Sequence, residues 1–330
     1  MLCLFNKAYV QIFYNLEIFM NVLVTGSNGF VGSALIEHVA GIRKYQVIAA
    51  YRSLSMGSTG NAATLAIGDL GSLADITTSL RAVDVVVHTA GLAHVFNTSR
   101  NFLDELHNIN VNGTVNLARQ AAVAGVRRFI FISSVKVNGN ETQPGRPYSE
   151  LSPIAPVDPY GRSKFEAEEK LRQLADETGM EIVIIRPPLV YGLGVKGNFR
   201  RLLHLVDLGI PLPLGGVRNQ RSLIALDNLV DFIITCISHP AAANQTFLVS
   251  DGEDLSTPEL LQCLGKAMNK PVRLISLPVN VIEFSALLVR RKKEVKMLCG
   301  NLQVNIARAR EMLGWTPPVT IAEGLRRTVA

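Results

Sequence analysis

The sequence of 330 residues predicts an α/β fold with a doubly wound parallel sheet. Short apolar, β-branched runs alternate with helical patterns through the first half of the chain. One run, VDVVVHTAG (83–91), is almost continuously apolar, as expected of a strand that is covered on both faces of a parallel sheet. A glycine-rich turn also separates the first predicted strand from the first predicted helix.

The alternation assigns the elements in order. Strands are predicted at or within 21–26, 45–52, 62–70, 83–91, 127–134, 181–187 and 245–252. Helices are predicted over 31–41, 72–81, 104–124 and 160–178, and residues 135–158 have little periodicity and predict a loop. After 187 the pattern loosens, with a strand–helix unit at 222–238 and mostly helical character over 255–330.

These elements predict two domains that are both discontinuous in sequence. The sheet domain takes 20–185 plus 222–250. A smaller, mostly helical domain takes 186–221 plus 251–330.

Composition indicates a globular protein, with 48% hydrophobic and 18% charged residues. The formal net charge of +6 mildly favours anionic ligands, but no basic stripe interleaved with aromatics points to nucleic acid. The cysteines Cys3, Cys236, Cys263 and Cys299 are scattered without metal-ligand spacing. The sequence therefore predicts a reduced, cytoplasmic protein with no metal site.

Residues 1–19 are apolar, but five polar or charged positions interrupt them: Asn6, Lys7, Gln11, Asn15 and Glu17. The segment fits neither a membrane span, which needs about 20 mostly apolar residues, nor a secretory signal. Met20 lies one residue before the first strand pattern. We therefore expect 1–19 to be a non-native or disordered leader, with a peripheral membrane anchor as the alternative.

The glycine-rich turn contains Gly26, Gly29 and Gly32 within TGSNGFVG (25–32). A residue without Cβ at Gly26 permits a tight turn, one at Gly29 lets the chain approach a pyrophosphate, and one at Gly32 lets the helix pack on the strand. The helix N-terminus then presents free N–H groups to the anion. Tight strand–helix turns also use glycine for steric reasons alone, but this position in the first βα unit predicts a dinucleotide site.

Tyr160 and Lys164 are four residues apart on a predicted helix, so they share one face. Pro159 helps to fix the start of that helix. A phenol with a pKa near 10 is a poor base at pH 7. A neighbouring ammonium and a cationic nicotinamide favour the phenolate, so Tyr160 is expected to exchange protons with a substrate hydroxyl or carbonyl.

TGSNGFVG (25–32) together with YGRSK (160–164) resembles the extended short-chain dehydrogenase/reductase family, in its NAD-dependent epimerase/dehydratase group. The resemblance covers about 21–330. Further segments follow the family's order: GDL (68–70), HTAG (88–91), NVNGT (110–114), SS (133–134), RPPLVYG (186–192) and LDNLVD (226–231). The combination is specific, although each segment alone is not.

The resemblance implies a Rossmann-type nucleotide-binding sheet, a substrate-binding second domain and a catalytic set of Ser134, Tyr160 and Lys164. Ser134 would hydrogen-bond the reacting oxygen. The implied cofactor contacts are Gly26, Asn28, Gly29, Phe30, Val31, Gly32, Arg52, Asp69, Leu70, Thr89, Ala90, Gly91, Asn110, Lys164 and Pro187.

The second predicted strand ends in Ala50, Tyr51 and Arg52, without the carboxylate with which NAD-preferring members hold the ribose 2′-hydroxyl. The Arg52 guanidinium suits a 2′-phosphate. NADP(H) is therefore favoured over NAD(H). The alternative is a solvated arginine at the end of a strand.

Similarity to nucleotide-sugar enzymes implies that the substrate is a UDP-sugar. The implied substrate contacts are Ser134, Lys136, Tyr160, Asn198 and Arg221, of which Arg221 resembles the family arginine that binds the pyrophosphate. Sugar 4,6-dehydratases carry an Asp-Glu pair directly after the Ser/Thr. Val135 and Lys136 occupy those positions here, which argues against dehydration.

Two reactions at C4 of the sugar remain. The favoured one, because of Arg52, is reduction of a UDP-4-keto-6-deoxy-N-acetylhexosamine in surface polysaccharide (O-antigen) biosynthesis. The alternative is 4-epimerisation of a UDP-sugar, glucose or N-acetylglucosamine, including lipid-linked forms. Asn138 and Leu189 depart from the well-known galactose-pathway epimerase. A non-catalytic dinucleotide sensor is a third interpretation, against which the retained Tyr160 and Lys164 argue.

Two interactions beyond the substrate are expected. The resemblance implies a homodimer through paired long helices, here 104–124 and 160–178. An apolar helical stretch with a basic end, VNVIEFSALLVRRKKEVKML (279–298), fits an interfacial helix on an anionic membrane. The alternative is a core helix whose basic end is solvated or faces the pyrophosphate.

Overall fold

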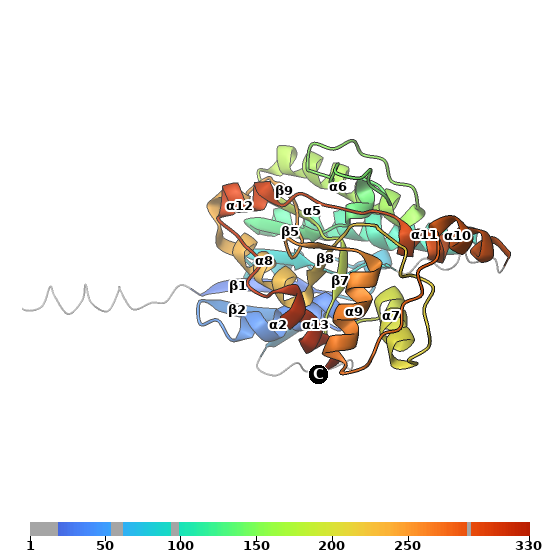
Figure 1. Cartoon of the computed structure of the whole chain (residues 1–330). Helices are drawn as coiled ribbons and strands as arrows, with labels where there is room; N and C mark the ends of the chain where they lie inside the picture. Colours follow the sequence, from blue (N-terminus) through green and yellow to red (C-terminus); the bar gives the residue numbers. More distant parts are fainter. Residues whose placement is uncertain (1–18, 54–61, 94–98, 289–291) are drawn as a thin grey trace, which may run out of the picture.

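The computed structural model describes residues 19–53, 62–93, 99–288 and 292–330 (Figure 1). Its main sheet has seven strands in the order β3-β2-β1-β4-β5-β6-β9, and every neighbouring pair is parallel. The strands are β1 (Met20–Thr25), β2 (Tyr45–Tyr51), β3 (Ala63–Ala66), β4 (Val85–His88), β5 (Arg128–Ile132), β6 (Glu181–Arg186) and β9 (Thr246–Leu248). The predicted doubly wound parallel sheet is confirmed.

Helices cover both faces of this sheet. The helices α2 (Phe30–Ala40) and α8 (Leu226–Ser238) pack together on one face, and α3 (Thr77–Leu80), α5 (Thr114–Ala124) and α6 (Pro159–Thr178) pack on the other. In β1, Val22 and Val24 join the α2–α8 core, while Leu23 between them joins the α5–α6 core. Because successive side chains point to opposite faces, a strand between two cores reads as an unbroken apolar run.

The helix predicted over 104–124 begins earlier and is interrupted. It consists of α4 (Arg100–His107), a π-helical segment (Asn108–Gly113) and α5. A π-segment inserts a wider turn and is frequent at functional sites. Here it contains the buried side chain of Asn110.

A second, three-stranded sheet has the order β10-β8-β7. Its strands are β7 (Leu189–Tyr191), β8 (Arg221–Ala225) and β10 (Asp254–Leu255). The remaining helices are α7 (Gly197–Asp207), α9 (Thr257–Ala267), α10 (Val279–Leu288), α11 (Lys292–Cys299), α12 (Ala307–Leu313) and α13 (Ile321–Val329). Helix α7 lies in a Pro- and Gly-rich region where no helix is predicted. The exact division into two domains stays a prediction.

The predicted loop 135–158 begins with a short 3-10 turn (Val135–Val137) and then reaches across to the C-terminal part of the chain. The Thr142 amide donates to the carbonyl of Asn301 at 2.9 Å, and the Tyr148 amide donates to the carbonyl of Gln303 at 2.8 Å. This loop therefore joins the main sheet to the segment that follows α11.

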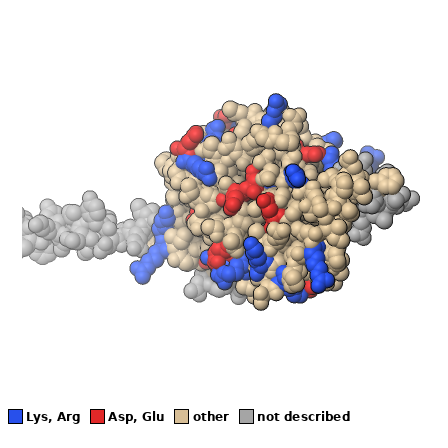
Figure 2. Space-filling view, in the orientation of Figure 1, with Lys and Arg blue, Asp and Glu red and all other residues tan. Residues whose placement is uncertain are grey.

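On the face shown in Figure 2, acidic side chains gather near the centre and basic ones lie around the rim. Within the described ranges, no helix is both long and apolar enough to cross a membrane. Residues 1–18 of the predicted leader 1–19 lie outside the described residues. The basic end of the stretch 279–298 also falls outside them at Arg290 and Arg291.

Candidate functional site

Most of the predicted site residues follow the carboxyl ends of the main-sheet strands. The order of strands reverses between β1 and β4, because β2 lies on one side of β1 and β4 on the other. Open parallel sheets bind ligands in the crevice at such a reversal. Gly26 follows β1, and Thr89, Ala90 and Gly91 follow β4.

The glycine turn forms a cradle that side chains would fill. Gly26 has a φ of +72°, and a Cβ there would lie 2.7 Å from Thr89 Oγ1 and 2.8 Å from the Ala90 nitrogen. A Cβ on Gly32 would collide with the Gly26 carbonyl. Gly29 is the N-cap of α2 and has no side chain with which to cap it. The first amides of α2, from Phe30 onward, therefore suit a pyrophosphate.

We expect Gly32→Ala to abolish dinucleotide binding, because the added methyl group must push α2 away from the Gly26 carbonyl. Fluorescence titration of the purified variant with the reduced dinucleotide measures this loss. Gly41→Ala is the matched control, since its Cβ would come no closer than 3.4 Å to the His38 carbonyl. Retained affinity in Gly32→Ala would contradict the proposed role of the turn.

Arg52 and Asp69, both predicted cofactor contacts, lie close together at the edge of the sheet. Arg52 Nε is 3.9 Å from Asp69 Oδ2, with the side chains 70% and 46% exposed. Asp69 Oδ1 accepts from the Gly71 amide at 2.8 Å and so caps the short turn that begins at Leu70. Both side chains remain open enough to contact an adenosine.

Asn110 connects the segment after β4 to the helix that carries Tyr160. Its Oδ1 accepts from the Leu92 amide at 2.8 Å. Its Nδ2 donates to the Leu92 carbonyl at 3.0 Å and to Ser163 Oγ at 3.1 Å. The geometry fits a residue that orders the site rather than one that reacts.

The structure brings Ser134, Lys136, Tyr160 and Lys164 into one region. Ser134 directly follows β5 and caps the 3-10 turn, with its Oγ accepting from the Lys136 amide at 3.3 Å. A Cβ on Gly161 would lie 2.7 Å from the Lys136 carbonyl. Helix α6 can therefore approach the turn closely only because residue 161 is glycine.

Lys164 is buried beside this group. Its Nζ donates to the Ile132 carbonyl at 2.9 Å and lies 6.0 Å from the centre of the Tyr160 ring. Burial lowers the pKa of Lys164 to about 8, although the Glu168 carboxylate opposes this shift.

The pKa of Tyr160 departs from the direction expected from the sequence. Burial, followed by the charge of Asp158, raises it above its ordinary value. The positive charge of Lys164 alone therefore does not outweigh the effect of burial on the pKa of Tyr160. A nicotinamide, when bound in its oxidised form, would supply the further positive charge that favours the phenolate.

His88 is a site residue that the sequence analysis does not identify. Its Nδ1 bonds to Thr25 Oγ1 at 2.7 Å and its Nε2 to Thr114 Oγ1 at 3.0 Å. Burial, and then the charge of Lys164, lower the pKa of His88 to about 3, so the ring is neutral at pH 7. The only indication of His88 in the sequence is that a polar residue ends the apolar run of the predicted strand.

Glu168 is a second such residue, one helical turn after Lys164. Its fully buried carboxylate accepts from Ser133 Oγ at 2.5 Å, from Arg186 at 2.9 and 2.5 Å, and from Arg172 at 2.9 Å. These bonds join α6 to the ends of β5 and β6. Ser133 precedes Ser134, so its bond to Glu168 holds the end of β5 against the helix that carries Tyr160 and Lys164.

The remaining predicted residues lie in two places. Pro187 is buried, and its carbonyl accepts from the Val135 amide at 3.0 Å, next to Ser134. Asn198 and Arg221 instead contact the segment 297–300. Asn198 Nδ2 is 3.8 Å from Met297 Sδ, and Arg221 Nη1 donates to the Gly300 carbonyl at 3.0 Å.

The chain is similar to known proteins along most of its length. The model of the NAD dependent epimerase/dehydratase family matches residues 22–250. The chain is 45% identical to a UDP-glucose 4-epimerase of Vibrio cholerae, covering 93% of this chain and 94% of the relative. It is 28% identical to the N-acetyl-α-D-glucosaminyl-diphospho-ditrans,octacis-undecaprenol 4-epimerase of Escherichia coli O157:H7, covering 94% of each.

A solved structure has the same fold. UDP-glucose 4-epimerase of Thermotoga maritima, with UDP-glucose, superposes with a TM-score of 0.73 at 23% identity. The match covers 94% of this chain and 97% of that one.

Proposed function

The chain belongs to the NAD-dependent epimerase/dehydratase family, and from this premise we propose that it is a UDP-sugar 4-epimerase. The observation that carries the proposal is the grouping of Ser134, Tyr160 and Lys164 next to the segment after β4, where a Cβ on Gly91 would lie 3.5 Å from Lys164 Nζ, in a chain 45% identical to a UDP-glucose 4-epimerase. This choice reverses the order of the two reactions expected from the sequence, because the similarity favours the epimerase.

The proposed chemistry needs a proton and a hydride to leave the sugar together. A dinucleotide whose pyrophosphate binds at the glycine turn would supply, through its nicotinamide, the hydride acceptor and donor. Tyr160 takes the proton of the C4 hydroxyl as C4 is oxidised to the ketone, and it returns a proton when the ketone is reduced from the other face. Ser134 holds the C4 oxygen, and Lys164 favours the phenolate.

We assign the diphosphate of the substrate to the region around Arg221. Lys296 is a second cation in this region. Its Nζ lies 3.0 Å from Glu141 Oε2, and the charge of the same Glu141 carboxylate also acts on Arg221. Asn198 contacts the same α11 region through Met297. A diphosphate suits two such cations.

The second candidate is the 4-ketoreductase, which a specific observation favours. Arg52 follows β2 where NAD-preferring members carry a carboxylate, and its side chain is 70% exposed. A reductase must exchange oxidised for reduced cofactor, and NADPH would use this cation for its 2′-phosphate. An epimerase retains its cofactor through the cycle.

One experiment separates the two reactions. Purified protein is incubated with UDP-glucose or UDP-N-acetylglucosamine, and separately with a UDP-4-keto-6-deoxy-N-acetylhexosamine plus NADPH. We expect the 4-epimer to form from a UDP-sugar without added cofactor, and denatured protein to release NAD. Loss of NADPH with the keto sugar, and no epimer, would instead establish the reductase.

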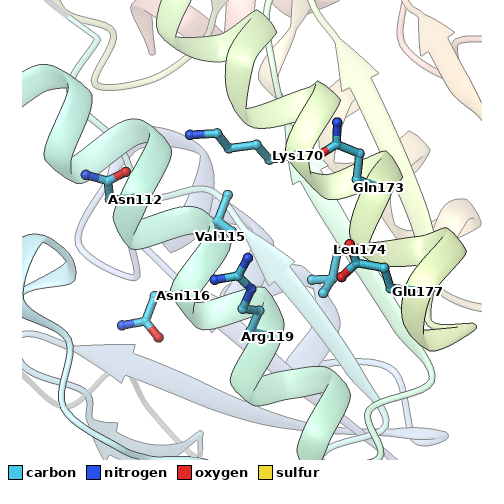
Figure 3. Close-up of a pocket in the computed structure, with 8 residues that line it drawn as sticks. All are labelled: Asn112, Val115, Asn116, Arg119, Lys170, Gln173, Leu174 and Glu177. Atoms are coloured by element: carbon cyan, nitrogen blue, oxygen red, sulfur yellow. The ribbon is translucent and has the colours of Figure 1, made fainter.

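We also propose that the protein is a homodimer through α5 and α6. A surface hollow lies between these helices (Figure 3), with Val115 and Leu174 at its floor and Arg119, Lys170 and Glu177 around it. An apolar floor with a polar rim suits an interface between copies. The membrane contact of 279–298 stays a prediction.

A further inference from the structure

A second ammonium group, that of Lys136, lies beside Tyr160. Lys136 Nζ is 5.7 Å from the centre of the Tyr160 ring, about as far as the Lys164 ammonium at 6.0 Å. Lys136 Nζ also forms an ion pair with Asp158 Oδ2 at 2.7 Å. Both distances to the ring lie within the range at which a cation interacts with an aromatic face.

Asp158 is beside Tyr160 for a structural reason. It is the N-cap of α6, and its Oδ1 accepts from the Gly161 amide at 2.8 Å. A carboxylate is favourable at the positive end of a helix. The same negative charge, however, stands two residues before the tyrosine that must become a phenolate, and like charges oppose each other.

We infer that Lys136 is a positioning residue for the catalytic step: its ammonium neutralises the capping carboxylate of Asp158 and so keeps the phenolate of Tyr160 accessible. The inference rests on the proposed function, in which Tyr160 transfers the proton. It gives Lys136 a role other than the predicted direct contact with substrate.

The charges around these groups agree with this role. Burial alone would raise the pKa of Asp158, but hydrogen bonds from Lys136 and Gly161 and the charge of Lys136 outweigh burial and lower this pKa below its ordinary value, so the carboxylate is ionised at pH 7. Asn140 also hydrogen-bonds to it. In the part of the chain that the structure describes, the charged groups beside Tyr160 are Lys136 from the 3-10 turn, Asp158 at the helix cap and Lys164 from α6 itself.

The turn and the helix hold this arrangement in place. The Lys136 carbonyl lies against Gly161, and the Val137 carbonyl accepts from the Ala155 amide at 3.1 Å. The Lys136 side chain is 40% exposed and that of Asp158 is 27% exposed. Because the pair is accessible, both side chains can be replaced without opening the core.

The test is the pH dependence of turnover in Lys136→Met, Asp158→Asn and the double variant. Lys136→Met leaves the carboxylate uncompensated, which disfavours the phenolate. Its acid limb should move to higher pH, and turnover at pH 7 should fall about tenfold. Asp158→Asn keeps a capping oxygen but removes the charge, so its acid limb should move to lower pH.

The double variant should return the profile close to that of the wild type, because it removes both charges together. Lys270→Met is the matched control: this lysine, 41% exposed, also forms an ion pair, with Asp207 at the end of α7, outside the candidate site and the proposed dimer interface. Shifts of both single variants in one direction, or additive losses in the double variant, would overturn the inference. Should Lys136→Met fail to fold, the acid shift of Asp158→Asn alone decides.

A second readout separates this inference from the proposed function. Ultraviolet difference titration against Tyr160→Phe reports ionisation of Tyr160 without turnover. Opposite shifts of the Tyr160 titration in Lys136→Met and Asp158→Asn would support the role of the charge pair. Retained activity in Tyr160→Phe would refute only the proposed proton transfer. Unchanged titration in both single variants would refute the pair.

Discussion

Replacing Tyr160 with phenylalanine is expected to lower turnover by about 10²–10⁴-fold while the dinucleotide still binds. The substitution removes only the hydroxyl that exchanges the proton. Lys164 keeps its bond to the Ile132 carbonyl, and the glycine turn is untouched. Turnover of the UDP-sugar and fluorescence titration of the reduced dinucleotide are measured on the same preparation.

Tyr45→Phe is the control for the loss of a tyrosine hydroxyl elsewhere in the chain. Tyr45 begins β2, and its hydroxyl bonds to Ser238 Oγ at 3.2 Å at the end of α8. Its turnover should match that of the wild type. Turnover of Tyr160→Phe within a few-fold of the wild type would remove Tyr160 from the chemistry.

Glu168→Ala is expected to lower the free energy of unfolding by about 3–5 kcal/mol, because it leaves the guanidinium of Arg186 buried without its carboxylate. Glu168 is fully buried and Arg186 is 2% exposed. Urea unfolding at pH 7 measures the change. Glu169→Ala, at an exposed position one residue later on α6, should change stability little.

Removing both charges distinguishes an unpaired charge from lost packing. Glu168→Leu with Arg186→Met should recover much of the stability lost in Glu168→Ala, since apolar residues of similar volume often replace a buried ion pair. The same double variant should still have low turnover, because Ser133 loses its partner next to Ser134. Equal stability of Glu168→Ala and the wild type would contradict the proposed energetic role.

The sequence predicts the main sheet well because each buried strand contributes to two cores. Val22, Leu23 and Val24 alternate between them, which produces a pattern visible over a few residues. Helix α7 is missed because the prolines and glycines around it obscure its apolar face, which packs through Phe199 and Leu202. Local periodicity is therefore informative only where the pattern is not interrupted.

For the candidate site, the sequence identifies residues that belong to short motifs. The glycine turn and the Tyr160–Lys164 spacing depend on neighbours within one helix or turn. Glu168 and Arg186 are 18 positions apart, and their contact depends on the pairing of β6 beside β5. The Lys136–Asp158 pair likewise depends on a loop of no periodicity, and its contact with Tyr160 has no signal in the sequence.

The loop 135–158 leaves the sheet directly after Ser134 and returns directly before Tyr160. Between Ser134 and Tyr160, the loop hydrogen-bonds to the residues after α11 through the amides of Thr142 and Tyr148. Ser134 and Tyr160 therefore lie at the two ends of one loop, and the middle of this loop is hydrogen-bonded to the C-terminal part of the chain. We expect that breaking the contacts of this loop with Asn301 and Gln303 would disturb the proposed catalytic residues Ser134 and Tyr160 from a distance.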